Sequence, residues 1–113
     1  MANMIVSGAG ISAVNGTYEE GNYINGKPSY NKAQDYILYW RRDTELQEYV
    51  WGIYSFFGIS SLYYSLDDVA SPDLCSSWAV LNGVSPAPTV TKEGEEPTGI
   101  PKHYLYYARM RGN

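Results

Sequence analysis

Two aromatic runs decide the fold, Tyr36-Ile37-Leu38-Tyr39-Trp40 and Tyr49-Val50-Trp51-Gly52-Ile53-Tyr54. Aromatic and β-branched side chains in runs of this length favour a pleated, half-buried strand over a helix. The stretch between the runs, residues 41–48, is rich in charge and therefore predicts a hairpin loop. We expect two long, neighbouring strands, with Gly52 leaving room for a ring to lie over the backbone.

Turn signals flank these strands on the N-terminal side. Asn15-Gly16 and Asn25-Gly26 predict two-residue hairpin turns, because Asn and Gly adopt positive φ angles readily. The stretch 17–24 between them is strand-like, and Gly21 indicates a bulge or bend within it. A short strand is expected at 27–30, where Pro28 requires an edge or strand-start position because it cannot donate to a ladder.

The second half of the chain continues the β pattern. Strands are expected at 62–65 and 77–81, with one short helical turn within 66–74 and an extended segment along a sheet edge at 84–90. No helix-length window shows a period of 3.6 residues. The prediction is an all-β fold, a small antiparallel sandwich or partly open barrel of roughly six to eight strands.

The composition changes at Thr91. Residues 91–101 are acidic and rich in Pro and Gly, which is typical of a linker, and residues 102–110 are strand-like again. The chain is therefore divided into an aromatic β-module at 1–90 and a linker with a C-terminal strand at 91–113. We expect this strand to dock on the same domain; docking on another subunit, which would make a homo-oligomer, is the alternative.

Charge and hydropathy exclude several classes of function. The net charge is −4 and the basic residues are scattered, so no nucleic-acid partner is expected. No segment approaches the roughly 20 apolar residues of a membrane span. The first residues lack the basic and apolar regions of a signal peptide. The sequence predicts a soluble chain without membrane insertion.

The side chains that carry most enzyme chemistry are scarce. His103 is the sole histidine and Cys75 the sole cysteine, so a catalytic triad, a zinc site and an intramolecular disulfide are not expected. Asp67, Asp68 and Asp73 lack the spacing and glycine of a known calcium loop. The prediction is a protein that is not an enzyme and has no cofactor or metal.

The order of these signals resembles a known sequence pattern. The elements are Asn15-Gly16-x-Tyr18, Asn25-Gly26-Lys27-Pro28-x-Tyr30, Tyr36–Trp40, Trp51-x-Ile53, Tyr63-Tyr64-Ser65, Pro72, Trp78 and Pro86-Ala87-Pro88-Thr89. Together they are similar to a short aromatic module that recurs in large multidomain proteins of protists, algae and invertebrates. The resemblance covers about residues 6–90 and implies a compact, non-catalytic β-module. It assigns no functional residues.

Tyrosine is over-supplied for a core of this size, with twelve among 113 residues. Tyr and Trp dominate binding hot spots, so we expect an aromatic sheet surface that binds carbohydrate or protein. Core packing is the competing interpretation for the three tryptophans. The alternative function is a structural or assembly component, such as a virion or surface accessory protein, that pairs through a sheet edge or the C-terminal segment. The predicted binding residues are Tyr36, Tyr39, Trp40, Trp51, Tyr54, Tyr63 and Tyr64.

Overall fold

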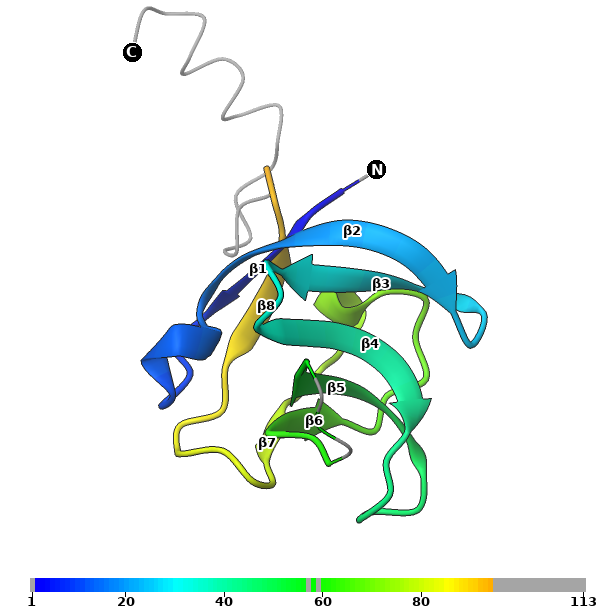
Figure 1. Ribbon diagram of the computed structural model, residues 1–113, viewed down its shortest axis with the longest axis vertical. Coiled ribbons are helices and arrows are strands. Elements are labelled where there is room, and N and C mark those ends of the chain that lie inside the picture. The colour runs from blue at the N-terminus through cyan, green and yellow to red at the C-terminus, as the bar shows by residue number, and fades with distance from the viewer. Residues whose placement is uncertain (1, 57, 59, 95–113) are drawn as a thin grey trace, which may run out of the picture.

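The computed structural model describes residues 2–56, 58 and 60–94, and shows an all-β fold. Its eight strands form one curled antiparallel sheet in the order β7-β6-β5-β4-β3-β2-β1-β8 (Figure 1). The prediction of a partly open barrel or sandwich is confirmed. The strands are β1 (Met4–Ser7), β2 (Gly16–Ile24), β3 (Lys27–Lys32), β4 (Tyr36–Arg42), β5 (Tyr49–Ser55), β6 (Tyr63–Ser65), β7 (Ala79–Val80) and β8 (Thr89–Lys92).

The two aromatic runs form β4 and β5, and they pair along their full length. Leu38 lies opposite Ile53 and Trp40 opposite Trp51, so one face of this hairpin carries large apolar side chains. That face belongs to the hydrophobic core, together with Met4, Val6, Tyr18, Tyr30, Tyr63 and Val90 from other strands. The predicted neighbouring strands and the charged loop between them are confirmed.

The Asn-Gly pairs at residues 15–16 and 25–26 have different roles. Asn25 and Gly26, with φ angles of 57° and 85°, close the predicted turn between β2 and β3. The prediction of a hairpin turn at Asn15-Gly16 is wrong. Asn15 follows the 3₁₀ turn η1 (Ser12–Val14), and its side-chain amide bonds both the N–H and the C=O of Ala9 at 2.9 and 3.1 Å. These two hydrogen bonds join the ends of the loop from Ala9 to Asn15, and β2 begins at the next residue, Gly16.

Two finer features of the β2–β3 hairpin follow the sequence. The register shifts between Glu20 and Tyr23, where Gly21 predicted a bulge. Pro28 is the second residue of β3, near the strand start, although β3 itself lies inside the sheet between β2 and β4.

The strands at the two ends of the sheet, β7 and β8, are short. β7 has two residues, fewer than the predicted strand at 77–81, because its ladder with β6 pairs only Tyr63 with Val80 and Tyr64 with Ala79. β8 lies at the other end of the sheet and pairs with β1. It overlaps the predicted edge segment 84–90 only at Thr89 and Val90, and it runs on to Lys92. The segment from Val69 to Trp78, which contains the 3₁₀ turn η2 (Pro72–Leu74), packs against the core and lies beside β8.

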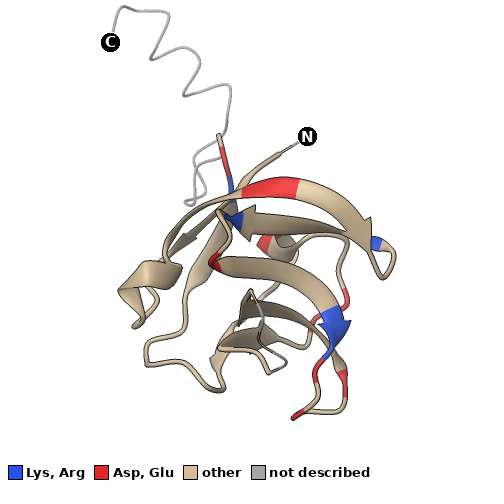
Figure 2. Cartoon of the chain, in the orientation of Figure 1, with Lys and Arg blue, Asp and Glu red and all other residues tan. Residues whose placement is uncertain are grey.

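Charges are sparse on this framework. Figure 2 shows Lys and Arg at separate places along the strands, with the pair Arg41 and Arg42 at the end of β4. No helix within the described part of the chain is long and apolar enough to cross a membrane. The predicted C-terminal strand at 102–110 lies outside the described residues.

Candidate binding groove

Three of the predicted binding residues lie in the interior. Trp51, Tyr54 and Tyr63 are 0% exposed, and each has its polar atom bonded within the chain. Trp51 Nε1 donates to the Val69 carbonyl at 2.9 Å, and the Tyr54 hydroxyl donates to Asp43 Oδ2 at 3.0 Å. The Tyr63 hydroxyl donates to the Val84 carbonyl at 2.7 Å. These rings hold the fold together and offer no surface to a ligand.

Trp40 is also surrounded by the chain itself, at 8% exposure. The Lys27 ammonium lies 4.1 Å from its ring centroid, and the Tyr49 ring stacks on it at a centroid distance of 5.9 Å. Lys27 further donates to the Val69 carbonyl at 2.7 Å and pairs with the Asp68 carboxylate. The core interpretation therefore applies to Trp40 and Trp51.

The outer face of β4 and β5 is half-covered by their own side chains. The Tyr39 and Tyr54 rings meet edge to face at 5.4 Å, and Arg41 bonds the Tyr39 hydroxyl at 3.0 Å while lying 5.1 Å from the Tyr54 ring. A Cβ on Gly52 would stand 2.4 Å from Tyr54 Cε1, so the ring does lie against that backbone, as predicted. Tyr36 is half-buried and packs against the core.

The buried carboxylate of Asp43 accepts hydrogen bonds that hold Tyr54 and the neighbouring loops in place. Asp43 is 0% exposed and accepts hydrogen bonds from the backbone N–H groups of Glu45, Leu46 and Ser61 and from the Tyr54 hydroxyl. Burial alone raises the pKa of Asp43, but the backbone donors outweigh it and hold the pKa below its ordinary value. Burial and the neighbouring Asp43 charge raise the pKa of Tyr54, so its hydroxyl stays protonated and donates.

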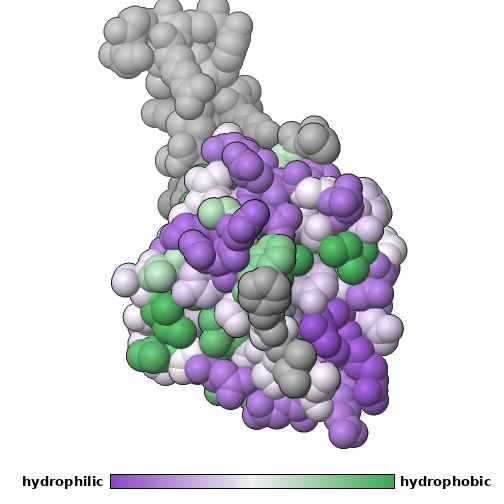
Figure 3. All heavy atoms as spheres, viewed as in Figure 1, coloured by the Kyte–Doolittle hydropathy of each residue, from purple (hydrophilic) through white to green (hydrophobic). Residues whose placement is uncertain are grey.

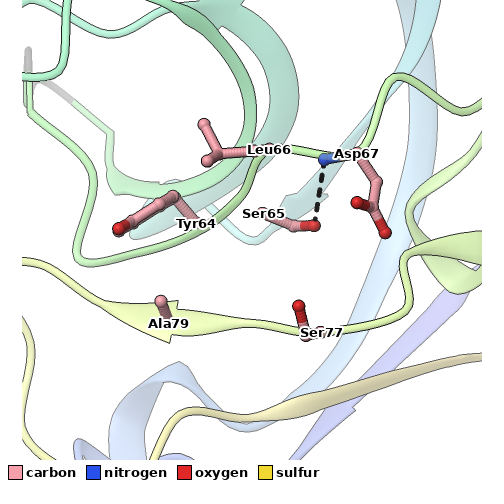
Figure 4. A pocket seen from close by; sticks show the side chains of 6 residues that line it. All are labelled: Tyr64, Ser65, Leu66, Asp67, Ser77 and Ala79. Carbon is pink, nitrogen blue, oxygen red and sulfur yellow. Dashed lines mark hydrogen bonds between the residues drawn. The ribbon is translucent and has the colours of Figure 1, made fainter.

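Tyr64, the last predicted residue, lines a small pocket where the β6–β7 ladder opens. The pocket has a volume of about 240 Å³ and is lined by Tyr64, Ser65, Leu66, Asp67, Ser77 and Ala79 (Figure 4). Asp67 closes one end, because its Oδ2 accepts hydrogen bonds from the Ser76 N–H and hydroxyl at 2.6 and 2.7 Å. These bonds lower the pKa of Asp67.

A larger groove lies between the segment before β7 and the edge strand β8. This seam groove has a volume of about 350 Å³, and its lining residues are Asp73, Cys75, Ser76, Ser77, Trp78, Pro88, Thr89, Val90 and Thr91. Trp78 is half-buried, in contrast with the enclosed Trp51. The lining thus combines one large aromatic ring with a carboxylate and four side-chain hydroxyls.

Asp73 and Cys75 are the titratable side chains in the lining of the groove. Burial raises the pKa of the Cys75 thiol to about 11, so it is protonated at neutral pH and a poor nucleophile. The three nearby carboxylates have separate partners. Asp67 accepts a hydrogen bond from Ser76, and Asp73 accepts one from Ser71. Asp68 forms an ion pair with Lys27. No group of three or more His, Cys, Asp or Glu side chains that could hold a metal is found within residues 2–56, 58 and 60–94.

Comparison with protein-family models, with curated proteins and with solved structures finds no match to this chain. The resemblance to a recurring aromatic module therefore stays a prediction. Trp78 was not among the predicted site residues, although its position in a short segment rich in serine, Cys75-Ser76-Ser77-Trp78, distinguishes it from the tryptophans inside aromatic runs.

Proposed function

We propose that this chain is a non-enzymatic binding module that holds a carbohydrate in the seam groove. The observation that carries the proposal is the half-buried Trp78 in a groove of about 350 Å³ with Asp73 and several hydroxyls around it. Small-molecule sites are concave, with an apolar wall and a few placed polar groups, and begin at about 300 Å³. The seam groove has both properties.

The chemistry of the lining fits a sugar. An indole ring offers a flat apolar face to the C–H groups of a pyranose, while carboxylate and hydroxyl oxygens bond its hydroxyls. The lining residues include Asp73 and neither Lys nor Arg. Since a carboxylate repels an anionic ligand and no cation in the lining offsets it, we expect a neutral sugar and not an acidic one.

Protein binding through a sheet edge is the second candidate, because both ends of the sheet have an edge without a strand partner among the described residues. Such an edge carries backbone N–H and C=O groups that can pair with an added strand. This candidate corresponds to the structural or assembly role that the sequence suggested as its alternative.

A glycan array tests the first proposal. The parent chain should bind at least one class of neutral sugars, and Trp78→Ala should weaken binding about tenfold or more, because losing a central aromatic contact costs about 2 kcal/mol. Tyr23→Ala is the matched control, since Tyr23 is a 70% exposed aromatic residue outside the groove. Absence of sugar binding, or equal losses for both variants, would contradict the proposal.

A further inference from the structure

We propose that the ligand of the seam groove is a neutral oligosaccharide of at least two sugar residues, which crosses the chain at Ser77 and reaches the small pocket beside Tyr64. The two hollows are neighbours, because Ser77 lines both of them. Figure 4 shows Ser77 and Ala79 across the small pocket from Tyr64 and Asp67. The inference rests on the proposed function and extends it, because it gives the sugar a second place to bind.

Side chains on the outer face of the sheet connect the two hollows. Tyr64 lies between two buried residues of β6, so its side chain points away from the core. Thr89 and Thr91 flank the buried Val90 in β8, and they point away from the core for the same reason. Ser77 is exposed between them. A ligand on this outer face can therefore contact both hollows without entering the core.

The same kinds of side chain recur in the two hollows. Each has one aromatic ring and one carboxylate, Trp78 and Asp73 in the seam groove and Tyr64 and Asp67 in the small pocket. One oxygen of each carboxylate accepts a hydrogen bond from a nearby serine. The other oxygen of each, and the Ser77 hydroxyl, have no hydrogen-bond partner within the part of the chain that the structure describes. A ligand that repeats an apolar ring face and free hydroxyls matches both hollows, and neither lining contains a Lys or Arg for an acidic sugar.

Volume and spacing set the minimum length of the ligand. The small pocket, at about 240 Å³, is below the range of about 300–1,000 Å³ that is usual for small-molecule sites, whereas the two hollows together lie well within it. Tyr64 pairs with Ala79, and the seam groove lies between the same segment and β8. A ligand that runs from β6 to β8 spans at least two strand spacings, about 10 Å. This span exceeds one pyranose ring, so a monosaccharide fills one hollow and only a longer sugar reaches both.

Calorimetric titration of the full chain tests this with the cellobiose, maltose, mannobiose and xylobiose series, each from the monosaccharide to the tetrasaccharide. For at least one series, the affinity of the parent chain should rise about tenfold or more from the monosaccharide to the longer sugars, because a second aromatic contact is added. Tyr64→Ala should remove this gain and leave the Kd of the monosaccharide within about twofold of the parent value. Trp78→Ala should weaken binding at every length, because its ring belongs to the first hollow.

Tyr23→Ala is the matched control, because it removes an exposed aromatic ring that lines neither hollow. Urea unfolding checks that each variant is folded, and Tyr64→Leu, which keeps an apolar side chain in β6, replaces Tyr64→Ala if the alanine variant is not.

The outcomes separate the inference from the proposed function. Trp78-dependent binding with equal affinity at every length, or with a gain that Tyr64→Ala leaves intact, would overturn the inference and keep the proposed function. Length-dependent binding that needs Tyr64 but not Trp78 would place the sugar outside the seam groove and overturn the proposed function, and the crossing at Ser77 with it. Absence of binding for every sugar would overturn both.

Discussion

The β4–β5 hairpin and the seam groove use aromatic residues in opposite ways. In the hairpin, Trp40, Trp51 and Tyr54 are enclosed, with Lys27, Val69 and Asp43 as partners for their rings and polar atoms. At the seam, the ladder between β6 and β7 ends after two pairs, and Trp78 stays half-exposed beside a groove. The enclosed rings have partners from distant segments, whereas Trp78 packs against the core and also borders the groove.

Exposed hydrophobic residues are scattered over the surface of the molecule. The face of the molecule in Figure 3 shows hydrophobic residues as separate patches among hydrophilic ones. The large exposed apolar side chains come from different parts of the chain and include Tyr23, Tyr49, Leu66 and Leu74. We therefore prefer the seam groove, which holds the half-buried Trp78, to the outer face of the hairpin as the candidate site.

Replacing each tryptophan in turn gives the sharpest contrast. Trp51→Ala should lower the free energy of unfolding by about 3–5 kcal/mol, because it leaves a large cavity in the core. Trp78→Ala should cost no more than about 2 kcal/mol, because the ring is only partly removed from water. Urea unfolding of both variants measures this. Similar losses would mean that the two regions do not differ as described.

Replacing the carboxylate of Asp43 should have the next largest effect on stability. Asp43→Asn should cost about 2 kcal/mol, because an amide nitrogen replaces one oxygen that accepts from buried donors. The folded-state pKa of Asp43 is lowered, so its stabilisation is present above its unfolded value of about 4 and is lost as the pH falls through the folded pKa.

Urea unfolding between about pH 3 and 7 checks this sign. The difference in stability between the parent chain and Asp43→Asn should shrink towards acid pH. A difference that stays constant, or that grows as the pH falls, would contradict the assignment of Asp43 as an ionised acceptor.

Gly52 tests how tightly the hairpin is packed. Gly52→Ala should destabilise by about 1–2 kcal/mol, although alanine is ordinarily preferred to glycine in a strand, because its Cβ meets the Tyr54 ring. A double-mutant cycle with Tyr54→Leu measures the coupling by urea unfolding. If the cost of Gly52→Ala is the same with and without the ring, the close contact is not its cause.

Lys27 and its ion-pair partner Asp68 give the smallest expected effects. Lys27→Met should cost about 1 kcal/mol, since it removes the cation beside Trp40 but keeps an apolar stem of similar length. Asp68→Asn should change stability by less than about 0.5 kcal/mol, because the Asp68 side chain is 78% exposed. Thermal unfolding of both variants compares them; a larger loss for Asp68→Asn would place the stabilisation in the ion pair and not in the ring contact.

Much of the fold could be predicted from local signals. The aromatic runs gave β4 and β5, Asn25-Gly26 gave the β2–β3 turn, and Gly21 gave the bulge. The turn prediction at Asn15-Gly16 was wrong, because Asn15 stabilises a longer loop with its side chain. The Asn15 amide bonds Ala9, and the Asn15 backbone is extended, with a φ of −72°. Turn propensity indicates which backbone angles a residue adopts at low energetic cost. It does not indicate which of these angles the surrounding contacts will favour.

The candidate site was less predictable for a related reason. Alternation along a strand shows which side chains share a face, as it did for Leu38 and Trp40, but both faces of β4 are apolar. Which rings become enclosed depends on residues distant in sequence, such as Lys27 and Asp43. Of the seven predicted residues, Tyr36, Tyr39 and Tyr64 stay half-exposed, and Tyr64 lines a pocket.

The sequence by itself determined the class of fold, the strands and their pairing in the central hairpin, because runs of aromatic and β-branched side chains and turn residues act over a few positions. Only the tertiary structure decided which aromatic residues are accessible. Segment 69–78 packs against the core, supplies the carbonyl that Trp51 bonds, and leaves Trp78 at the groove beside β8. Burial is a property of contacts between distant parts of the chain, and no local pattern specifies it.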